Sequence, residues 1–126
     1  MNSSNIVSGK NGEDAACIFL LEKGYKILER NFQKRYGEID IVALDKSNKN
    51  EPALVFVEVK TRTSLEFGNP LEAITPWKLK SVVKTVDYYI LTHKNVPDLL
   101  RIDAIAVYLN SNGLVQNIEH VKNITE

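Results

Sequence analysis

Carboxylate and ammonium groups share one face of the most apolar segment of the chain. The stretch Val55–Lys60 reads Val-Phe-Val-Glu-Val-Lys, which predicts a buried strand. Because side chains of a strand alternate between its two faces, Glu58 and Lys60 lie on the same face. An unpaired charge in such a place costs several kcal/mol or shifts its pKa towards the neutral form. Another acid, Asp40, interrupts the preceding apolar run 39–43, and together these residues predict a metal-dependent phosphodiesterase site.

The spacing of the two apolar runs predicts which acids face each other. If the runs pair antiparallel around a loop centred near Lys49, the numbers of opposite residues sum to about 98, and Asp40 faces Glu58 about 5 Å away at Cβ. Two opposed carboxylates repel unless a cation lies between them, and oxygen ligands of this kind suit Mg²⁺ or Mn²⁺. Lys60 would then orient or activate the attacking water, or offset negative charge on the phosphate, and both roles stay open.

Two further groups are candidate ligands of the same ion. Glu13 can approach from a predicted helix and bind through water or through a second ion, and the backbone carbonyl of Val59 can contribute an oxygen. A simpler explanation of Glu13 is that an acid in a first helical turn interacts favourably with the helix dipole. A simpler explanation of the charged strand is an ion pair between Lys60 and Asp40 or Glu58.

Basic and hydroxyl side chains near these acids are candidates for contacts with nucleic acid. Phosphate contacts are expected from residues after the charged strand, in the turn before the first acidic strand, and on a later helix: Thr61, Arg62, Lys34, Arg35 and Lys78. Exposed basic residues on helices more often only keep a protein soluble. Trp77 and the pair 88–89 can stack on bases, although aromatic residues beside a core stripe more often pack in the core.

The composition indicates one ordinary globular domain. The 126 residues are 44% hydrophobic and 25% charged, and 16 basic residues balance 16 acidic ones, so any basic surface must be local. The single Cys17 excludes an internal disulfide and favours the reducing cytoplasm. The longest apolar run, 15–21, is too short to cross a bilayer, and no signal peptide is expected. We therefore expect one domain over residues 1–126, in which residues 1–8 form a polar leader.

The order of elements predicts an α/β fold with a mixed sheet flanked by helices. A first helix is expected from about Gly12 to Lys23, closed by Gly24, and a second begins at Thr75 and Pro76, a cap followed by proline. Its core stripe is predicted as Leu79, Val82, Val83, Val86 and Ile90. Strands are predicted over 25–32, 39–43, 53–61, 101–109 and 114–121, with a loop over 45–52 and an irregular stretch over 62–70.

Several motifs in one order resemble those of the YraN-like uncharacterised bacterial proteins. The residues that carry the resemblance are Gly12-Glu13 with Ala16, Gly24-Tyr25, Arg30-Asn31, Gly37-Glu38-Ile39-Asp40, Phe56 to Arg62, Phe67-Gly68, Lys78 and Arg101-Ile102-Asp103. These proteins belong to the restriction-endonuclease-like superfamily with its acidic, acidic-x-lysine signature, and the chain is also similar to archaeal junction resolvases. Ile102 departs from the aromatic residue usual at its position, which concerns packing.

The resemblance implies a restriction-endonuclease-like core of three layers, with Glu13, Asp40, Glu58 and Lys60 in the active-site positions. The first hypothesis is therefore a Mg²⁺-dependent endonuclease acting on DNA, including branched DNA, and a homodimer is expected because junction-acting relatives use two-fold symmetry. The second is a nucleic-acid-binding module that cuts little and assists a partner enzyme. The third is a protein-interaction domain in which the acids only pair with Lys60 and Arg62.

Overall fold

The computed structural model describes residues 4–63 and 74–125, and its elements follow the expected order. They are α1 (Ser4–Glu22), β1 (Lys26–Lys34), β2 (Gly37–Asp45), β3 (Ala53–Thr63), α2 (Pro76–Thr92), β4 (Leu99–Leu109) and β5 (Val115–Val121). Of the stretch 62–70 that was expected to be irregular, Arg62 and Thr63 continue β3, and 64–70 lie outside the described residues. The resemblance motif at Phe67-Gly68 also lies outside them.

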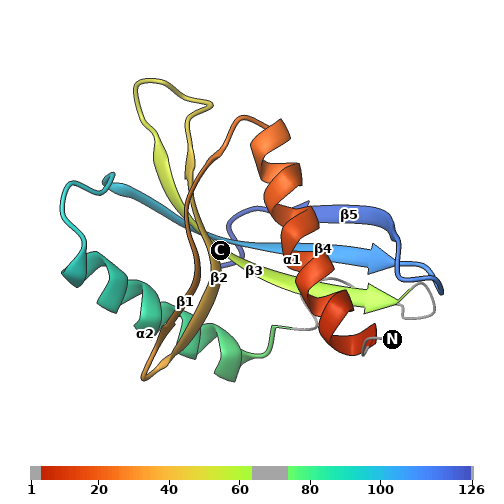
Figure 1. Ribbon diagram of the computed structural model, residues 1–126. Coiled ribbons are helices and arrows are strands. Elements are labelled where there is room, and N and C mark those ends of the chain that lie inside the picture. Colours follow the sequence, from red (N-terminus) through yellow and green to blue (C-terminus); the bar gives the residue numbers. More distant parts are fainter. Residues whose placement is uncertain (1–3, 64–73, 126) are drawn as a thin grey trace.

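The described strands form one mixed sheet in the order β1-β2-β3-β4-β5. Neighbours are antiparallel except β3 and β4, which run parallel. A parallel pair needs a crossover, and α2 supplies it between β3 and β4 (Figure 1). The predicted mixed α/β architecture is therefore confirmed.

Each helix covers one face of the sheet, which gives three layers (Figure 1). Ala16, Cys17 and Leu20 of α1 pack with inward residues of β2, β3 and β4, such as Val57 and Ile105. On the other face, α2 packs on a separate core whose members are Phe32, Ile39, Val42, Leu54, Phe56, Val82, Val86, Tyr89 and Ile102. Alternation along β3 sends odd-numbered residues towards α1 and even-numbered residues towards α2.

The first helix begins earlier than the sequence suggested. The start was expected near Gly12, after a polar leader, but α1 begins at Ser4. Gly12 lies inside the helix and directly against Thr61 of β3, where any added Cβ would meet the Thr61 hydroxyl. The glycine therefore allows close approach of α1 to the sheet. Its low helix propensity had favoured a helix boundary at this position.

The second helix begins as expected, and its core face is rotated slightly from the prediction. Thr75 caps α2 by accepting a hydrogen bond from the Lys78 amide at 3.1 Å, and Pro76 is its first residue. Val83 was predicted to be in the core and is exposed, whereas Thr85 and Tyr89 are buried. Leu79 and Ile90 are only partly buried, at the margin of the stripe. Within the described residues, no helix is long and apolar enough to cross a membrane.

Candidate functional site

The first acid lies where β2 separates from β3. The predicted register is correct, since Ile41 pairs with Val57 and Val42 with Phe56, but the ladder ends at the pair Ile41–Val57. Beyond it, Asp40 Oδ2 accepts a hydrogen bond from the backbone amide of Val59 at 2.7 Å. A side chain thus replaces the main-chain partner that β2 would have supplied, and the Asp40 carboxylate lies against the strand that carries Glu58.

The strands bend at this position. Ile39 packs in the α2-side core and Ile41 in the α1-side core, so the strict alternation of β2 breaks at Asp40. On β1, Asn31 lies between the residues paired with Ile41 and Ile39 and has a positive φ of 52°, a left-handed conformation. Asn tolerates this conformation better than most residues. The β2–β3 ladder ends at the same level, beside Asp40.

Glu58 is the second acid, and it is almost fully buried. Its side chain is 1% exposed and, as an even-numbered residue of β3, lies on the α2 side of the sheet. Neither carboxylate oxygen accepts a hydrogen bond from a donor in the described part of the chain. Lys78 of α2 brings its Nζ to 3.4 Å from Glu58 Oε1. The ion pair expected as the simpler explanation is therefore made by Lys78 and not by Lys60.

The two acids perturb each other's ionisation. Burial, followed by the Asp40 charge, raises the pKa of Glu58 to about 8, although Lys78 opposes the shift. Burial also raises the pKa of Asp40, and the charges of Glu38 and Glu13 act in the same direction. When Glu58 is protonated, its hydroxyl can donate a hydrogen bond to Asp40. When both groups are ionised, the Glu58 oxygens need a cation.

These groups fit a hard divalent cation. Asp40 and Glu58 supply carboxylate oxygens, and the Val59 carbonyl faces the same side of β3 as its amide, which bonds Asp40. Among residues 4–63 and 74–125, no group of three or more His, Cys, Asp or Glu side chains could jointly hold a metal ion. Mg²⁺ often uses one or two protein carboxylates and retains several waters, so a donor set of this size suits it.

Lys60 lies one step further along the same face as Glu58. It is half-buried and, within the described residues, makes no ion pair. Its neighbour across the parallel ladder is the buried Ala106. An ammonium group in this position remains available for a ligand.

Glu13 is held in place from α1. Its Oε1 accepts hydrogen bonds from Arg30 Nε at 3.0 Å, Arg30 Nη2 at 2.9 Å and Asn31 Nδ2 at 3.1 Å. The helix-dipole explanation is wrong, because α1 begins at Ser4 and has no acid in its first turn. Glu13 is near enough to raise the pKa of Asp40, and the resemblance pair Arg30-Asn31 fixes its orientation.

The residues predicted to contact nucleic acid lie on β3, at the β1–β2 turn and on α2. Thr61 packs against Gly12, so its hydroxyl has a structural neighbour. Arg62 follows on β3 and already has an interaction partner. Lys34 and Arg35 lie at the exposed β1–β2 turn, and Lys78 is the partner of Glu58. The predicted contacts therefore come from three elements, β3, the β1–β2 hairpin and α2.

A second buried polar cluster, around Arg101, was not predicted from the sequence. Arg101 donates to Asp45 Oδ2 at 2.9 Å, to Asp103 Oδ1 at 2.9 Å and to the Tyr25 hydroxyl at 2.7 Å. His120 of β5 lies with Nε2 2.8 Å from Asp103 Oδ2. The available signal was the pair of charges at Arg101 and Asp103 in an otherwise apolar strand. This cluster has its hydrogen bonds satisfied, unlike Glu58.

The chain is similar to bacterial proteins that share one family description. The model of "Uncharacterised protein family UPF0102" matches residues 12–107. A UPF0102 protein of Chlorobium phaeobacteroides is 41% identical over 91% of this chain and 90% of its own length. One of Caldanaerobacter subterraneus is 44% identical over 91% of both chains, and one of Helicobacter hepaticus is 43% identical over 94% of this chain and 97% of its own.

Proposed function

Because the chain belongs to the uncharacterised protein family UPF0102, whose name states no activity, we propose a function from its own site: a divalent-metal-dependent endonuclease that hydrolyses DNA phosphodiester bonds. The observation that carries the proposal is the half-buried Asp40 beside the almost fully buried Glu58, whose oxygens accept no hydrogen bond in the described chain and are paired only with the Lys78 ammonium at 3.4 Å. An arrangement that destabilises the metal-free protein is expected where a cation is bound for function.

Each residue of the site has a distinct role in this proposal. Asp40, Glu58 and the Val59 carbonyl hold Mg²⁺ or Mn²⁺, which when bound neutralises phosphate charge and makes water more acidic. The half-buried Lys60 ammonium stabilises charge on the attacked phosphate or orients the water. Glu13, fixed by Arg30 and Asn31, orients a water at the same place.

The substrate is proposed from the surroundings of the site and from the resemblance. Arg62, with the basic residues of the β1–β2 turn and of α2, would contact phosphates beside the acids. The restriction-endonuclease-like superfamily and its junction resolvases suggest branched or otherwise structured DNA, cut by a two-fold dimer. Such an enzyme would act in the bacterial cytoplasm, where a free, buried Cys17 is stable.

The test is DNA cleavage by the wild-type chain and by variants that keep side-chain size. Branched, duplex and single-stranded DNA are incubated with Mg²⁺ or Mn²⁺, and Asp40→Asn, Glu58→Gln and Lys60→Met each lower the rate about 100-fold or more. Removing the metal with EDTA abolishes cleavage. The matched controls Asp87→Asn and Lys49→Met change exposed residues and retain the wild-type rate. Equal rates for wild type and the three site variants reject the proposal.

One observation favours a second candidate, a nucleic-acid-binding module without cleavage. Lys78 already supplies Glu58 with a protein cation at 3.4 Å, which reduces the need for a metal ion. In that case, DNA binding depends on salt and no cleavage follows when Mg²⁺ is added, since phosphate contacts release counterions and hydrolysis requires the ion. Calorimetry with Mn²⁺ separates the two, because only the enzyme shows binding that Glu58→Gln removes.

A further inference from the structure

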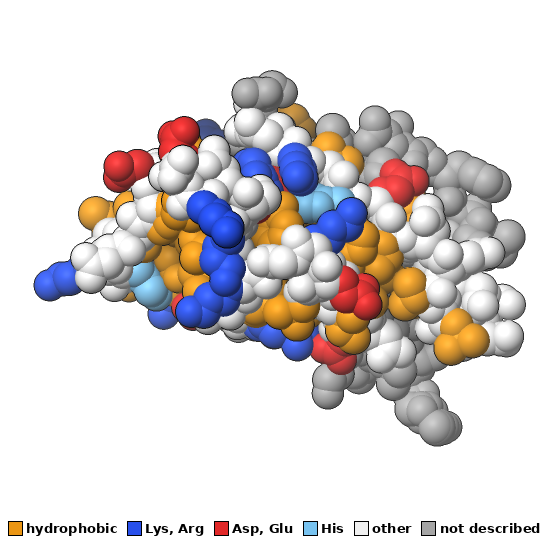
Figure 2. All heavy atoms as spheres, turned by 90° about the horizontal axis from the view of Figure 1, so that it is seen from above, with side chains coloured by type: hydrophobic (Ala, Val, Ile, Leu, Met, Phe, Trp, Pro, Cys, Tyr) orange, Lys and Arg blue, Asp and Glu red, His pale blue; other side chains and the backbone are white. Residues whose placement is uncertain are grey.

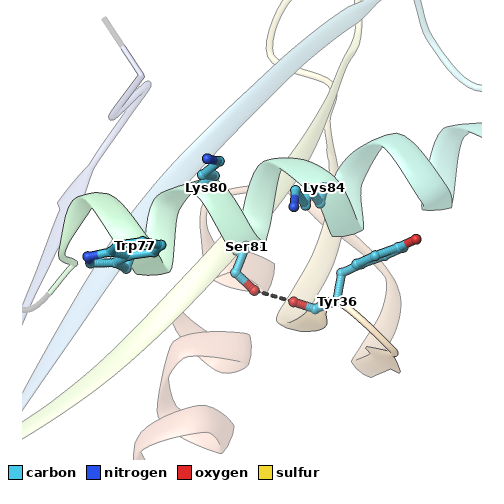
Figure 3. Close-up of a pocket in the computed structure, with 5 residues that line it drawn as sticks. All are labelled: Tyr36, Trp77, Lys80, Ser81 and Lys84. Atoms are coloured by element: carbon cyan, nitrogen blue, oxygen red, sulfur yellow. Dashed lines mark hydrogen bonds between the residues drawn. The ribbon is translucent and has the colours of Figure 1, made fainter.

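A basic and aromatic surface lies along α2, next to the proposed site. One pocket of about 180 Å³ lies between the β1–β2 turn and the first turns of α2 (Figure 3). A second, of about 410 Å³, continues from it along the turn, and Tyr36 lines both. We call the lining of the two pockets the α2–turn surface; besides Ser81, it consists of Lys34, Arg35, Tyr36, Trp77, Lys80, Lys84 and Tyr88.

The aromatic rings of this surface are not part of the core. Trp77 is 82% exposed, Tyr36 51% and Tyr88 38%, whereas the neighbouring Tyr89 is 3% exposed. The expectation that these aromatics pack in the core is therefore right for Tyr89 alone. In Figure 3, Trp77 and Tyr36 lie on either side of Ser81 along the helix. Large rings left in water beside one another are typical of a surface that binds a partner.

The cations of the surface are available, and two are held over rings. Among the described residues, Lys34, Arg35, Lys80 and Lys84 make no ion pair. Lys34 Nζ lies 5.8 Å from the centroid of Tyr88, and Lys84 Nζ lies 5.8 Å from that of Tyr36. The sole acid of α2 is Asp87. Positive charge and exposed rings thus alternate, which complements a strand of phosphates and bases.

Charge alone does not single out this surface. Figure 2 shows the molecule from above, the side on which the β2–β3 loop lies in Figure 1. This face also presents Lys and Arg side chains among hydrophobic ones. The chain as a whole is neutral. The distinguishing feature of the α2–turn surface is therefore the pairing of cations with exposed rings.

The surface is also preorganised. The Ser81 hydroxyl donates a hydrogen bond to the Tyr36 carbonyl (Figure 3), and an added Cβ at Gly37 would meet the same hydroxyl. The backbone of the turn is thereby held against α2 before any ligand binds. A fixed platform loses little entropy when it binds.

We propose that the α2–turn surface binds a short unpaired stretch of DNA, with bases stacked on Trp77 and Tyr36 and phosphates beside Lys34, Arg35, Lys80 and Lys84. The surface starts next to Lys78, which contacts Glu58, so a strand on it leads to the acids. From Lys78 to Tyr88 the helix rises about 15 Å, the length of about four stacked nucleotides. The inference rests on the proposed function for the choice of DNA, and it makes the substrate one with unpaired bases beside the cut.

Trp77 allows a direct test, because it is the only tryptophan in the chain. The full chain in EDTA is titrated with a single-stranded DNA of about eight nucleotides, twice the estimated contact length. Stacking on Trp77 quenches its fluorescence. Tyr36→Ala weakens binding about tenfold, and Lys84→Met reduces the slope of log affinity against log salt by about 0.7. The controls Leu91→Ala, at the exposed end of α2, and Lys49→Met bind as the wild type does.

Titrations with other molecules identify what the α2–turn surface binds. An abasic strand of the same length binds more weakly without quenching, a duplex binds more weakly, and polyglutamate does not quench. Equal binding of the abasic strand or the duplex overturns the proposal, and so does equal quenching by polyglutamate, which would indicate an acidic protein partner. Since EDTA prevents metal-dependent cleavage, binding without any cleavage on Mg²⁺ addition rejects the nuclease and supports the surface. Cleavage that Trp77→Ala and Tyr36→Ala leave unchanged rejects the surface alone.

Discussion

At the scale of single residues, the most consequential side chain is Glu58, a carboxyl group buried beside a second carboxyl group. Burial and the Asp40 charge raise its pKa from 4.5 to about 8. Between pH 4.5 and about 8, therefore, Glu58 keeps its proton in the folded state and has lost it in the unfolded state. Stability from this proton is fully present below pH 4.5 and is lost as the pH rises through about 8.

The resulting prediction concerns the free energy of unfolding of the metal-free protein. Between pH 5.5 and 8.5 the free energy of unfolding of the wild type falls by a few kcal/mol, since one pKa unit corresponds to about 1.4 kcal/mol. That of Glu58→Gln falls much less, because glutamine has the same shape and does not titrate. Urea unfolding in EDTA measures both, with the exposed Glu51→Gln as the control. Adding Mn²⁺ at pH 8.5 restores stability in the wild type only. Parallel pH curves for wild type and Glu58→Gln contradict the assignment.

Asn31 contributes to the site through its backbone and its amide. Its φ of 52° bends β1, and its Nδ2 bonds Glu13 Oε1 at 3.1 Å. Asn31→Gly keeps the bend and loses the amide, while Asn31→Ala loses the amide and strains the backbone. We expect equal reductions of cleavage in both variants but a lower stability, by about 1 kcal/mol, in Asn31→Ala only. Thermal unfolding beside cleavage rates measures this, and equal stability of the variants would show that the bend is not strained.

At the scale of elements, the docking of α1 on β3 depends on Gly12. An added Cβ meets the Thr61 hydroxyl, so Gly12→Ala pushes α1, and Glu13 with it, away from the sheet. Gly12→Ala is expected to destabilise by about 1–3 kcal/mol, although alanine favours helix by about 1 kcal/mol. Asn11→Ala, at the exposed neighbouring position, is the control and is neutral or stabilising. The double variant Gly12→Ala/Thr61→Ala recovers much of the loss, and strict additivity in chemical denaturation would mean that the two residues do not clash.

At the scale of the whole molecule, the Arg101 cluster joins β2, β4 and β5 to Tyr25, the residue before β1. Burial alone would raise the pKa of Asp45, but hydrogen bonds from Ser47 and Arg101 lower it to about 2, and those from His120 and Arg101 likewise lower the pKa of the buried Asp103. Both carboxyl groups therefore contribute stability above pH 3.8 that is lost in acid, for Asp45 as the pH falls through about 2.

Replacing Arg101 leaves two buried carboxylates without their cation. Arg101→Met is expected to lower the free energy of unfolding by about 3–5 kcal/mol at neutral pH. The deficit shrinks in acid, where both carboxyl groups become protonated and no longer need a cation. Guanidinium unfolding at pH 7 and pH 3 measures this, with the exposed Arg35→Met as the matched control. A deficit that stays constant with pH would show that packing, and not charge, explains the loss.

The sequence by itself determined the order of elements, the start of α2 and the register of the β2–β3 hairpin. These depend on local rules: alternation in strands, a Thr75-Pro76 cap, and a loop whose length fixes which residues pair. The same rules brought Asp40 and Glu58 together. The family description names no activity, so the cleavage assay decides the chemistry proposed for Asp40 and Glu58.

Only the tertiary structure decided which partners the charged side chains take. Lys78 and not Lys60 reaches Glu58, Glu13 of α1 bonds Arg30 of β1, and Ser81 of α2 bonds the turn at Tyr36. Each contact joins residues far apart in the chain, and it depends on how helices are placed on a twisted sheet. Local periodicity fixes the face on which a side chain lies, but the packing of another element on that face fixes what the side chain meets.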